Sequence, residues 1–96
     1  MTQVFEWDAD KNERNIEKHG IDFADAAQLF AEEYLSYVSP RNNEERMVGV
    51  GRLKDRIIAV AYTLRASNIR IISARVARRT ERKLYMQWSK KSKDNE

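Results

Sequence analysis

The sequence predicts one α+β domain, in which two N-terminal helices and one C-terminal helix pack on an antiparallel sheet of about four strands. Three observations lead to this prediction. The chain has 96 residues, which suits a single domain with one modest core. Apolar residues recur at helical spacing near both ends of the chain. Between them lie short β-branched and aromatic runs separated by turn residues, a pattern typical of an antiparallel meander.

A short strand and a surface helix open the chain. Residues 4–7 alternate apolar and polar side chains, which predicts a strand. A helix is expected over residues 9–19, with Asp8 or Asp10 as its N-cap, because an aspartate there can accept a hydrogen bond from a free backbone N–H. Gly20 follows as a left-handed C-cap.

A second helix and the strands come next. Asp22 is the expected N-cap of that helix, and the following apolar residues share one face. Gly49 and Gly51 lie on one face of their strand, which predicts close approach by a neighbouring element. The apolar helix face consists of Phe23, Ala26, Ala27 and Phe30, and strands are expected over residues 34–38, 46–52, 57–64 and 69–74, with a polar loop at 41–45.

The final helix is expected to start near Ala77 and reach about Trp88. Residues 89–96 are polar and predicted to fray. The expected order is therefore β-α-α-β-β-β-β-α in a single domain, residues 1–96, with the apolar run at residues 57–64 as the central strand.

The composition excludes several kinds of site. The chain has no cysteine and one histidine, so thiolate and multi-histidine metal sites are excluded, and we expect no metal or cofactor. No apolar run approaches the roughly 20 residues that span a membrane. The N-terminus lacks the basic and apolar blocks of a signal peptide, so a cytoplasmic protein is expected.

Charge is distributed unevenly along the chain. Residues 1–45 hold four basic and eleven acidic side chains, whereas residues 46–96 hold fourteen basic and four acidic ones. This separation predicts a face that binds a polyanion. The alternative is a set of solvated faces without a partner.

The basic residues concentrate around the last expected strand. Arg65 ends the central strand, and Arg70 and Arg75 stand at the two ends of the next one. If these strands pair through the turn at residues 66–68, Arg65 and Arg70 come close together. Arginine suits bidentate phosphate contacts, and arginines that lie so close need an anion or an acidic partner. Two further arginines, Arg78 and Arg82, follow Arg75 at helical steps and are expected to share one ridge with it.

Three other side chains near this cluster have two interpretations each. Tyr85 is either a core aromatic residue or a phenol that exchanges protons beside the arginines. Glu81 either orients an arginine or acts as a base. His19 either complements the C-terminal end of its helix or lines the site as an acid or base.

An ordered set of motifs covers nearly the whole chain, from Phe5 to Tyr85, and resembles the BrnT-type toxins. The order Arg78-Arg79-Thr80 and the preceding Val76 vary around the family's basic run. The motifs are Phe5-Glu6-Trp7-Asp8, Asn15, Lys18-His19-Gly20, Phe23, Ala26-Ala27, Phe30, Glu45-Arg46, Gly51-Arg52, Thr63-Leu64-Arg65, Arg70-Ile71-Ile72-Ser73-Ala74-Arg75, Ala77, Glu81 and Tyr85.

The resemblance implies a RelE-like ribonuclease fold and a toxin of a type II toxin–antitoxin system. Such a toxin cleaves RNA without a metal, through attack by the ribose 2′-OH on the adjacent phosphate, and inhibits translation. A BrnA-type antitoxin would bind it and contact operator DNA. Arg65, Arg75 and Arg79 would stabilise the phosphorane charge, and Tyr85 and His19 would move protons. Further RNA contacts are expected from Lys18, Arg70, Arg78, Glu81, Arg82 and Lys83.

Two other functions fit the same basic residues. A non-catalytic RNA- or partner-binding module would use them for affinity alone, with binding that falls steeply with salt. A ribosome-dependent factor would leave free RNA uncut but act on translating ribosomes.

Overall fold

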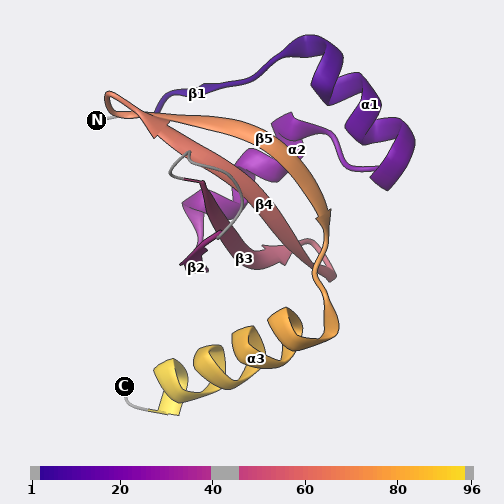
Figure 1. Ribbon diagram of the computed structural model, residues 1–96. Helices are drawn as coiled ribbons and strands as arrows, with labels where there is room; N and C mark the ends of the chain where they lie inside the picture. The colour runs from indigo at the N-terminus through magenta and orange to yellow at the C-terminus, as the bar shows by residue number, and fades with distance from the viewer. Residues whose placement is uncertain (1–2, 40–45, 95–96) are drawn as a thin grey trace.

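In the described part of the chain, five strands form one sheet in the order β1-β5-β4-β3-β2 (Figure 1). The computed structural model describes residues 3–39 and 46–94, so the predicted loop at 41–45 and the last two residues lie outside it. The strands are β1 Phe5–Glu6, β2 Leu35–Val38, β3 Met47–Leu53, β4 Arg56–Arg65 and β5 Asn68–Val76.

The sheet is mixed, which corrects the predicted antiparallel sheet of about four strands. Strands β2 to β5 form the expected antiparallel meander, and β4 is its central strand. β1 is the fifth strand and runs parallel to β5, with Phe5 opposite Ile69. Helices connect β1 to β2 along the chain. This long connection allows β1 to lie at the opposite edge of the sheet from β2, parallel to β5.

The caps of the first two helices are confirmed. α1 spans Ala9–His19, and Asp8 accepts a hydrogen bond of 3.0 Å from the backbone N–H of Lys11. Gly20 ends α1 with a φ of 70°, a left-handed conformation that glycine adopts without strain. Asp22 caps α2 by accepting from the N–H of Ala24 at 2.9 Å.

Two helices differ in length from the prediction. α2 covers only Phe23–Ala26 and continues as a 3₁₀-helix, η1, over Ala27–Ala31. α3 spans Arg79–Asp94, so it begins later than Ala77 and remains helical through most of the region predicted to fray. The domain thus keeps the expected order of elements, with a longer C-terminal helix.

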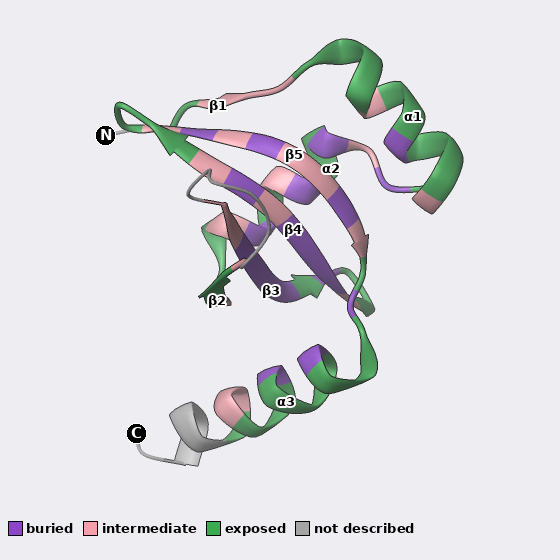
Figure 2. Ribbon diagram, in the orientation of Figure 1, coloured by how far each residue is buried: buried purple, intermediate pink, exposed green. Residues whose placement is uncertain are grey.

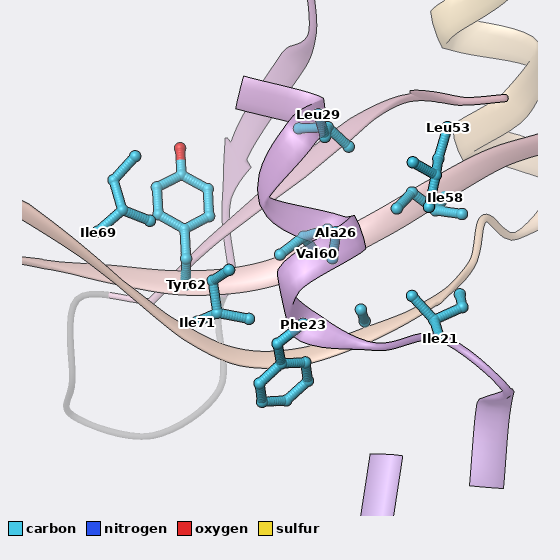
Figure 3. Packing of buried hydrophobic residues seen from close by; sticks show 11 residues of the cluster. Ile21, Phe23, Ala26, Leu29, Leu53, Ile58, Val60, Tyr62, Ile69 and Ile71 are labelled. Atoms are coloured by element: carbon cyan, nitrogen blue, oxygen red, sulfur yellow. The ribbon is translucent and has the colours of Figure 1, made fainter. Parts of the chain in front are cut away.

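Two apolar clusters lie on opposite faces of the sheet. Figure 3 shows the larger one, where Phe23 and Leu29 pack with Ile58, Val60 and Ile71 of the central strands. The expected close approach at Gly51 is confirmed, because a Cβ there would lie 3.0 Å from Cγ of Leu29. The smaller cluster lies under α3 and contains Val48, Val50, Ala59, Ala77 and Tyr85.

α3 touches the sheet with a narrow stripe. Of its side chains that the structure describes, Glu81 and Tyr85 are buried, and most of the others are exposed (Figure 2). The helix therefore covers one end of its sheet face and leaves the β4–β5 turn end of that face uncovered (Figure 1).

Candidate nucleic-acid interface

Three of the predicted arginines share one face of the sheet. In β4, alternate residues from Ala59 to Arg65 point to the face that carries α3. Strand pairing sets Arg75 opposite Ala59 and Arg70 opposite Thr63, so both point the same way. The face opposite the main core is therefore arginine-rich, as the charge pattern predicted.

These arginines form two groups rather than the single cluster that the sequence suggested at the junction of strand and helix. Arg65 and Arg70 lie near the β4–β5 turn, whereas Arg75 lies at the other end of β5. Arg75 follows Arg70 by five positions along the strand, a distance of about 16 Å. The antiparallel turn brings Arg65 beside Arg70 and thereby takes it away from the start of α3.

The first group lines an open hollow of about 390 Å³, here called the hairpin hollow. Arg65 is exposed at its rim, and the predicted closeness of Arg65 and Arg70 is confirmed because both line it. Arg70 also forms a salt bridge of 3.5 Å with Glu6, and both side chains are about one-third exposed. The lining residues are Lys11, Arg46, Thr63, Leu64, Arg65, Arg70 and Ile72.

A second hollow of about 190 Å³, here called the helix hollow, lies between α1 and β5. It contains Lys18 and His19, and it shares Lys11 and Ile72 with the hairpin hollow. The shared residues therefore bring His19 near the Arg65–Arg70 group, although His19 precedes Arg65 by 46 positions in the sequence. Its lining residues are Lys11, Arg14, Asn15, Lys18, His19, Ile72 and Ser73.

Asn15 fixes α1 against the sheet. Its side-chain amide donates to the carbonyl of Ala74 at 2.8 Å and accepts from the N–H of Ala74 at 3.0 Å. It also donates to the carbonyl of Ile21 at 2.9 Å, and only 6% of Asn15 is exposed. β5 pairs with β1 over a short stretch only. Beyond that stretch, the backbone of β5 at Ala74 forms hydrogen bonds with the Asn15 side chain instead of with a strand. These bonds hold the basic side of α1 beside β5.

The second group is a buried network around Glu81, here called the Glu81 network. Arg75 donates to the two carboxylate oxygens of Glu81 at 2.7 and 3.0 Å. The hydroxyl of Tyr37 donates to Oε2 at 2.5 Å, and the backbone N–H of Arg78 donates to Oε1 at 2.7 Å. Glu81 is 6% exposed, so its buried charge is matched by four donors.

The network shifts the pKa values of its members. Burial alone would raise the pKa of Glu81, but hydrogen bonds from Arg75, Tyr37 and the Arg78 backbone outweigh it and lower the pKa to about 2. The pKa of Tyr37 is raised by burial and by its hydrogen bond to the Glu81 carboxylate. The pKa of Arg75 is raised by its hydrogen bonds to Glu81. Near neutral pH the network therefore holds a fixed carboxylate and a neutral phenol.

The remaining predicted residues of α3 lie apart from the hairpin hollow. Arg78, Arg79 and Lys83 are exposed at the start of the helix. The predicted ridge of Arg75, Arg78 and Arg82 is wrong, because Arg75 belongs to β5 and the helix begins at Arg79. Arg82 instead lines a different hollow with Asp55, Arg56 and Met86, among others.

Tyr85 takes the core position that was one of its two interpretations. It is 6% exposed, and its ring centroid lies 5.9 Å from that of Trp88. Its exposed edge lines a hollow with Arg52 and Ser89, which shares no residue with the hollow that holds His19. The two predicted proton carriers are therefore not brought together.

Neither a metal site nor a membrane span is found in the residues that the structure describes. No group of three or more His, Asp or Glu side chains in residues 3–39 and 46–94 is placed to hold a metal ion. No helix within those residues is long and apolar enough to cross a membrane.

A family model described as the ribonuclease toxin BrnT of type II toxin–antitoxin systems matches residues 7–81. The match covers both hollows and the Glu81 network. The chain belongs to the BrnT family.

A solved structure supports the membership. The sequence is 33% identical to that of the Brucella abortus ribonuclease toxin BrnT, and the fold matches its crystal structure with a TM-score of 0.64. The similarity covers 81% of this chain and 100% of the Brucella chain. No curated protein matches the sequence.

The family match leaves out most of α3. The match ends at Glu81, so it includes the network carboxylate but not Tyr85 or the greater part of α3. The matched residues thus include those that line the two hollows, and Tyr85 lies beyond the matched residues.

Two cations that line the hollows, Lys11 and Arg14, were not singled out from the sequence, and Arg46 was named only as part of a motif. Lys11, Arg14 and Lys18 stand at i, i+3 and i+7, a spacing that predicts one helix face. The acidic balance of residues 1–45 hid this signal. Tyr37 was also missed as a partner of Glu81, because the contact joins residues 44 positions apart.

Proposed function

We propose that the protein is a toxin that cleaves RNA without a metal ion and thereby inhibits translation. Membership of the ribonuclease toxin family supports RNA as the substrate. The observation that carries the proposal is the hairpin hollow, where Lys11, Arg65 and Arg70 meet at an open surface. Such a cluster suits a phosphate that gains negative charge during a reaction.

The proposed reaction is attack by the 2′-OH of a ribose on the adjacent phosphorus. The bond from O2′ to phosphorus forms, and the bond from phosphorus to O5′ breaks, which leaves a 2′,3′-cyclic phosphate and a 5′-OH. The 2′-OH gives up a proton, and the leaving O5′ takes one. Arg65 and Arg70 would stabilise the added charge on the phosphorane oxygens, a contribution that can reach about 100-fold or more per group in related sites.

His19 is the proton carrier that the geometry favours. It lies in the helix hollow, which joins the hairpin hollow at Lys11 and Ile72. Imidazole exchanges protons near neutral pH. Contacts of RNA with Arg75, Arg78, Arg79, Arg82 and Lys83, and proton transfer by Tyr85, stay predictions, because these residues lie toward the α3 end of the molecule.

A protein partner is part of the same proposal. Type II systems pair the toxin with an antitoxin, and we expect one of the BrnA type that carries the complex to operator DNA in the cytoplasm. Val76, Leu84 and Met86 are 43, 60 and 50% exposed, and they supply apolar surface near α3 for such a contact.

The test is cleavage of purified RNA in excess EDTA. We expect fragments with cyclic phosphate and 5′-OH ends, and no cleavage at a site where 2′-deoxyribose replaces ribose. Cleavage that EDTA abolishes and Mg²⁺ restores would overturn the metal-free reaction. RNA that binds but is never cut, alone or on ribosomes, would favour the non-catalytic binding module.

A further inference from the structure

We infer that the helix hollow is a second RNA-binding subsite, so that one RNA strand runs from the hairpin hollow along α1. The inference rests on the proposed function for the identity of the ligand. It adds Arg14 to the RNA contacts, extends the role of Lys11 to both hollows and assigns Lys18 to RNA beyond the cleaved phosphate.

A bulge in β5 joins the two hollows. Tyr62 pairs with Ile71 and Ala61 with Ser73, so Ile72 is the extra residue between two registered pairs. Ile72 and Lys11 line both hollows. The two hollows therefore adjoin at these residues, and the pair of hollows is here called the depression.

The wall of this depression carries repeated positive charge. Lys11, Arg14 and Lys18 are exposed and follow one another at i, i+3 and i+7 on α1. Within the described residues, none of the three forms a salt bridge. A row of unpaired cations is poised to release counterions when a phosphate backbone binds.

The row is held in place before any ligand binds. Asn15 lies between Arg14 and Lys18 and is bonded to the backbone of Ala74 at 2.8 and 3.0 Å. Because this anchor is buried, α1 cannot shift from β5 without breaking these bonds. The spacing between the cations of α1 and Arg70 is therefore fixed, which lowers the entropic cost of binding.

RNA fits this depression better than a protein segment does. Protein interfaces usually contain a buried apolar core, whereas Ile72 and Leu64 are the large apolar side chains that line these two hollows. The apolar side chains suited to a protein partner, Leu84 and Met86 among them, lie on α3.

The experiment compares two double variants that remove the same charge. Arg14→Gln with Lys18→Gln changes the helix hollow, and Lys54→Gln with Lys90→Gln changes exposed residues that line neither hollow. The probe is a labelled single-stranded RNA of about ten nucleotides, a length in the range of single-strand sites. Each of its 2′-OH groups is methylated so that it cannot be cut, and binding is followed by fluorescence anisotropy over a salt titration.

Loss of two phosphate contacts should lower the slope of log affinity against log salt by about 1.4, which corresponds to about 25-fold weaker binding near 0.1 M salt. The control pair should stay within about threefold. With cleavable RNA, the helix-hollow variant should raise KM and leave kcat nearly unchanged.

If both double variants bind the long probe as tightly as the wild type does, the second subsite is overturned and the cleavage proposal stands. Equal loss in both would also overturn it, because the effect would then reflect net charge alone. If the protein cuts no RNA yet the helix-hollow variant alone loses affinity, the proposed function fails and the subsite remains. Unchanged RNA affinity with lost binding of polyglutamate would assign the depression to an acidic peptide instead. Circular dichroism melting checks that both variants fold.

Discussion

The two ends of β5 use the same kind of side chain in opposite ways. Near the β4–β5 turn, Arg65 is exposed and Arg70 shares only a long contact of 3.5 Å with Glu6. At the other end, Arg75 gives two short hydrogen bonds to Glu81, whose side chain is 7% exposed. The difference between these ends is the burial of the carboxylate, which is 33% exposed in Glu6 and 7% exposed in Glu81, because a buried charge needs matched partners and an exposed one does not.

The two ends of β5 therefore have different tasks. The Glu81 network links β2, β5 and the start of α3 through Tyr37, Arg75 and the Arg78 backbone. Its donors are already satisfied, so its first role is to hold α3 on the sheet. The hairpin hollow keeps Lys11 and Arg65 exposed to solvent and can accept a phosphate. Stability should therefore depend on one end of the strand and activity on the other.

The largest expected effect is on stability, from Glu81→Gln. Arg75 would lose its anionic partner while its side chain remains only 24% exposed. We expect the free energy of unfolding to fall by about 3 kcal/mol, the low end of the range for breaking a buried ion pair. Urea denaturation measures the change. Glu13→Gln, on the exposed surface of α1, is the control and should change stability by less than about 0.5 kcal/mol. A Glu81→Gln protein as stable as this control would contradict the network's role.

The pH dependence of stability should reveal the same carboxylate. The pKa of Glu81 is lowered in the folded protein from 4.5 to about 2. A lowered pKa contributes stability that is fully present above pH 4.5 and is lost as the pH falls toward 2. The stability difference between the wild type and Glu81→Gln should therefore shrink by about 2 kcal/mol between pH 5 and about pH 2. A difference that stays constant over this range would show that Glu81 is not ionised in the network.

The smallest expected effect comes from Tyr37→Phe, which removes one donor to Glu81 and keeps the ring. Tyr37 is 40% exposed, so water can partly replace the lost bond. We expect a loss of about 1 kcal/mol in unfolding free energy. In the Glu81→Gln background the same change should cost much less, because the two residues act through one bond. RNA cleavage by Tyr37→Phe should stay within about twofold of the wild type, which would sharpen the division between the two ends.

Local signals predicted the caps and the close approaches well. Asp8, Gly20 and Asp22 act within a few residues of their own position, so the chain alone determines them. Gly51 was read correctly for a similar reason, since a glycine in an apolar strand marks a crowded face. These features needed no knowledge of how distant segments meet.

Features that depend on distant contacts were missed or misplaced. The parallel pairing of β1 with β5 joins residues 5 and 69 across the chain, and no local pattern specifies it. The separation of Arg65 from Arg75 follows from the antiparallel turn, which places the end of β4 at the start of β5. The cations of α1 lie beside β5 because the Asn15 side chain is hydrogen-bonded to Ala74, which is 59 positions away in the sequence. The closeness of Arg65 and Arg70 was therefore predictable, but the separation of Arg75 from them and the addition of the α1 cations were not.

The value of kcat for RNA cleavage by Arg65→Gln shows whether the open end of the sheet carries the reaction. Arg65 is exposed at the end of β4, so the melting temperature should match that of the wild type. We predict a fall in kcat of about 100-fold, the lower range for losing one group that stabilises a transition-state charge. A folded Arg65→Gln protein that cleaves RNA at the wild-type rate would contradict the assignment of the reaction to the open end of the sheet.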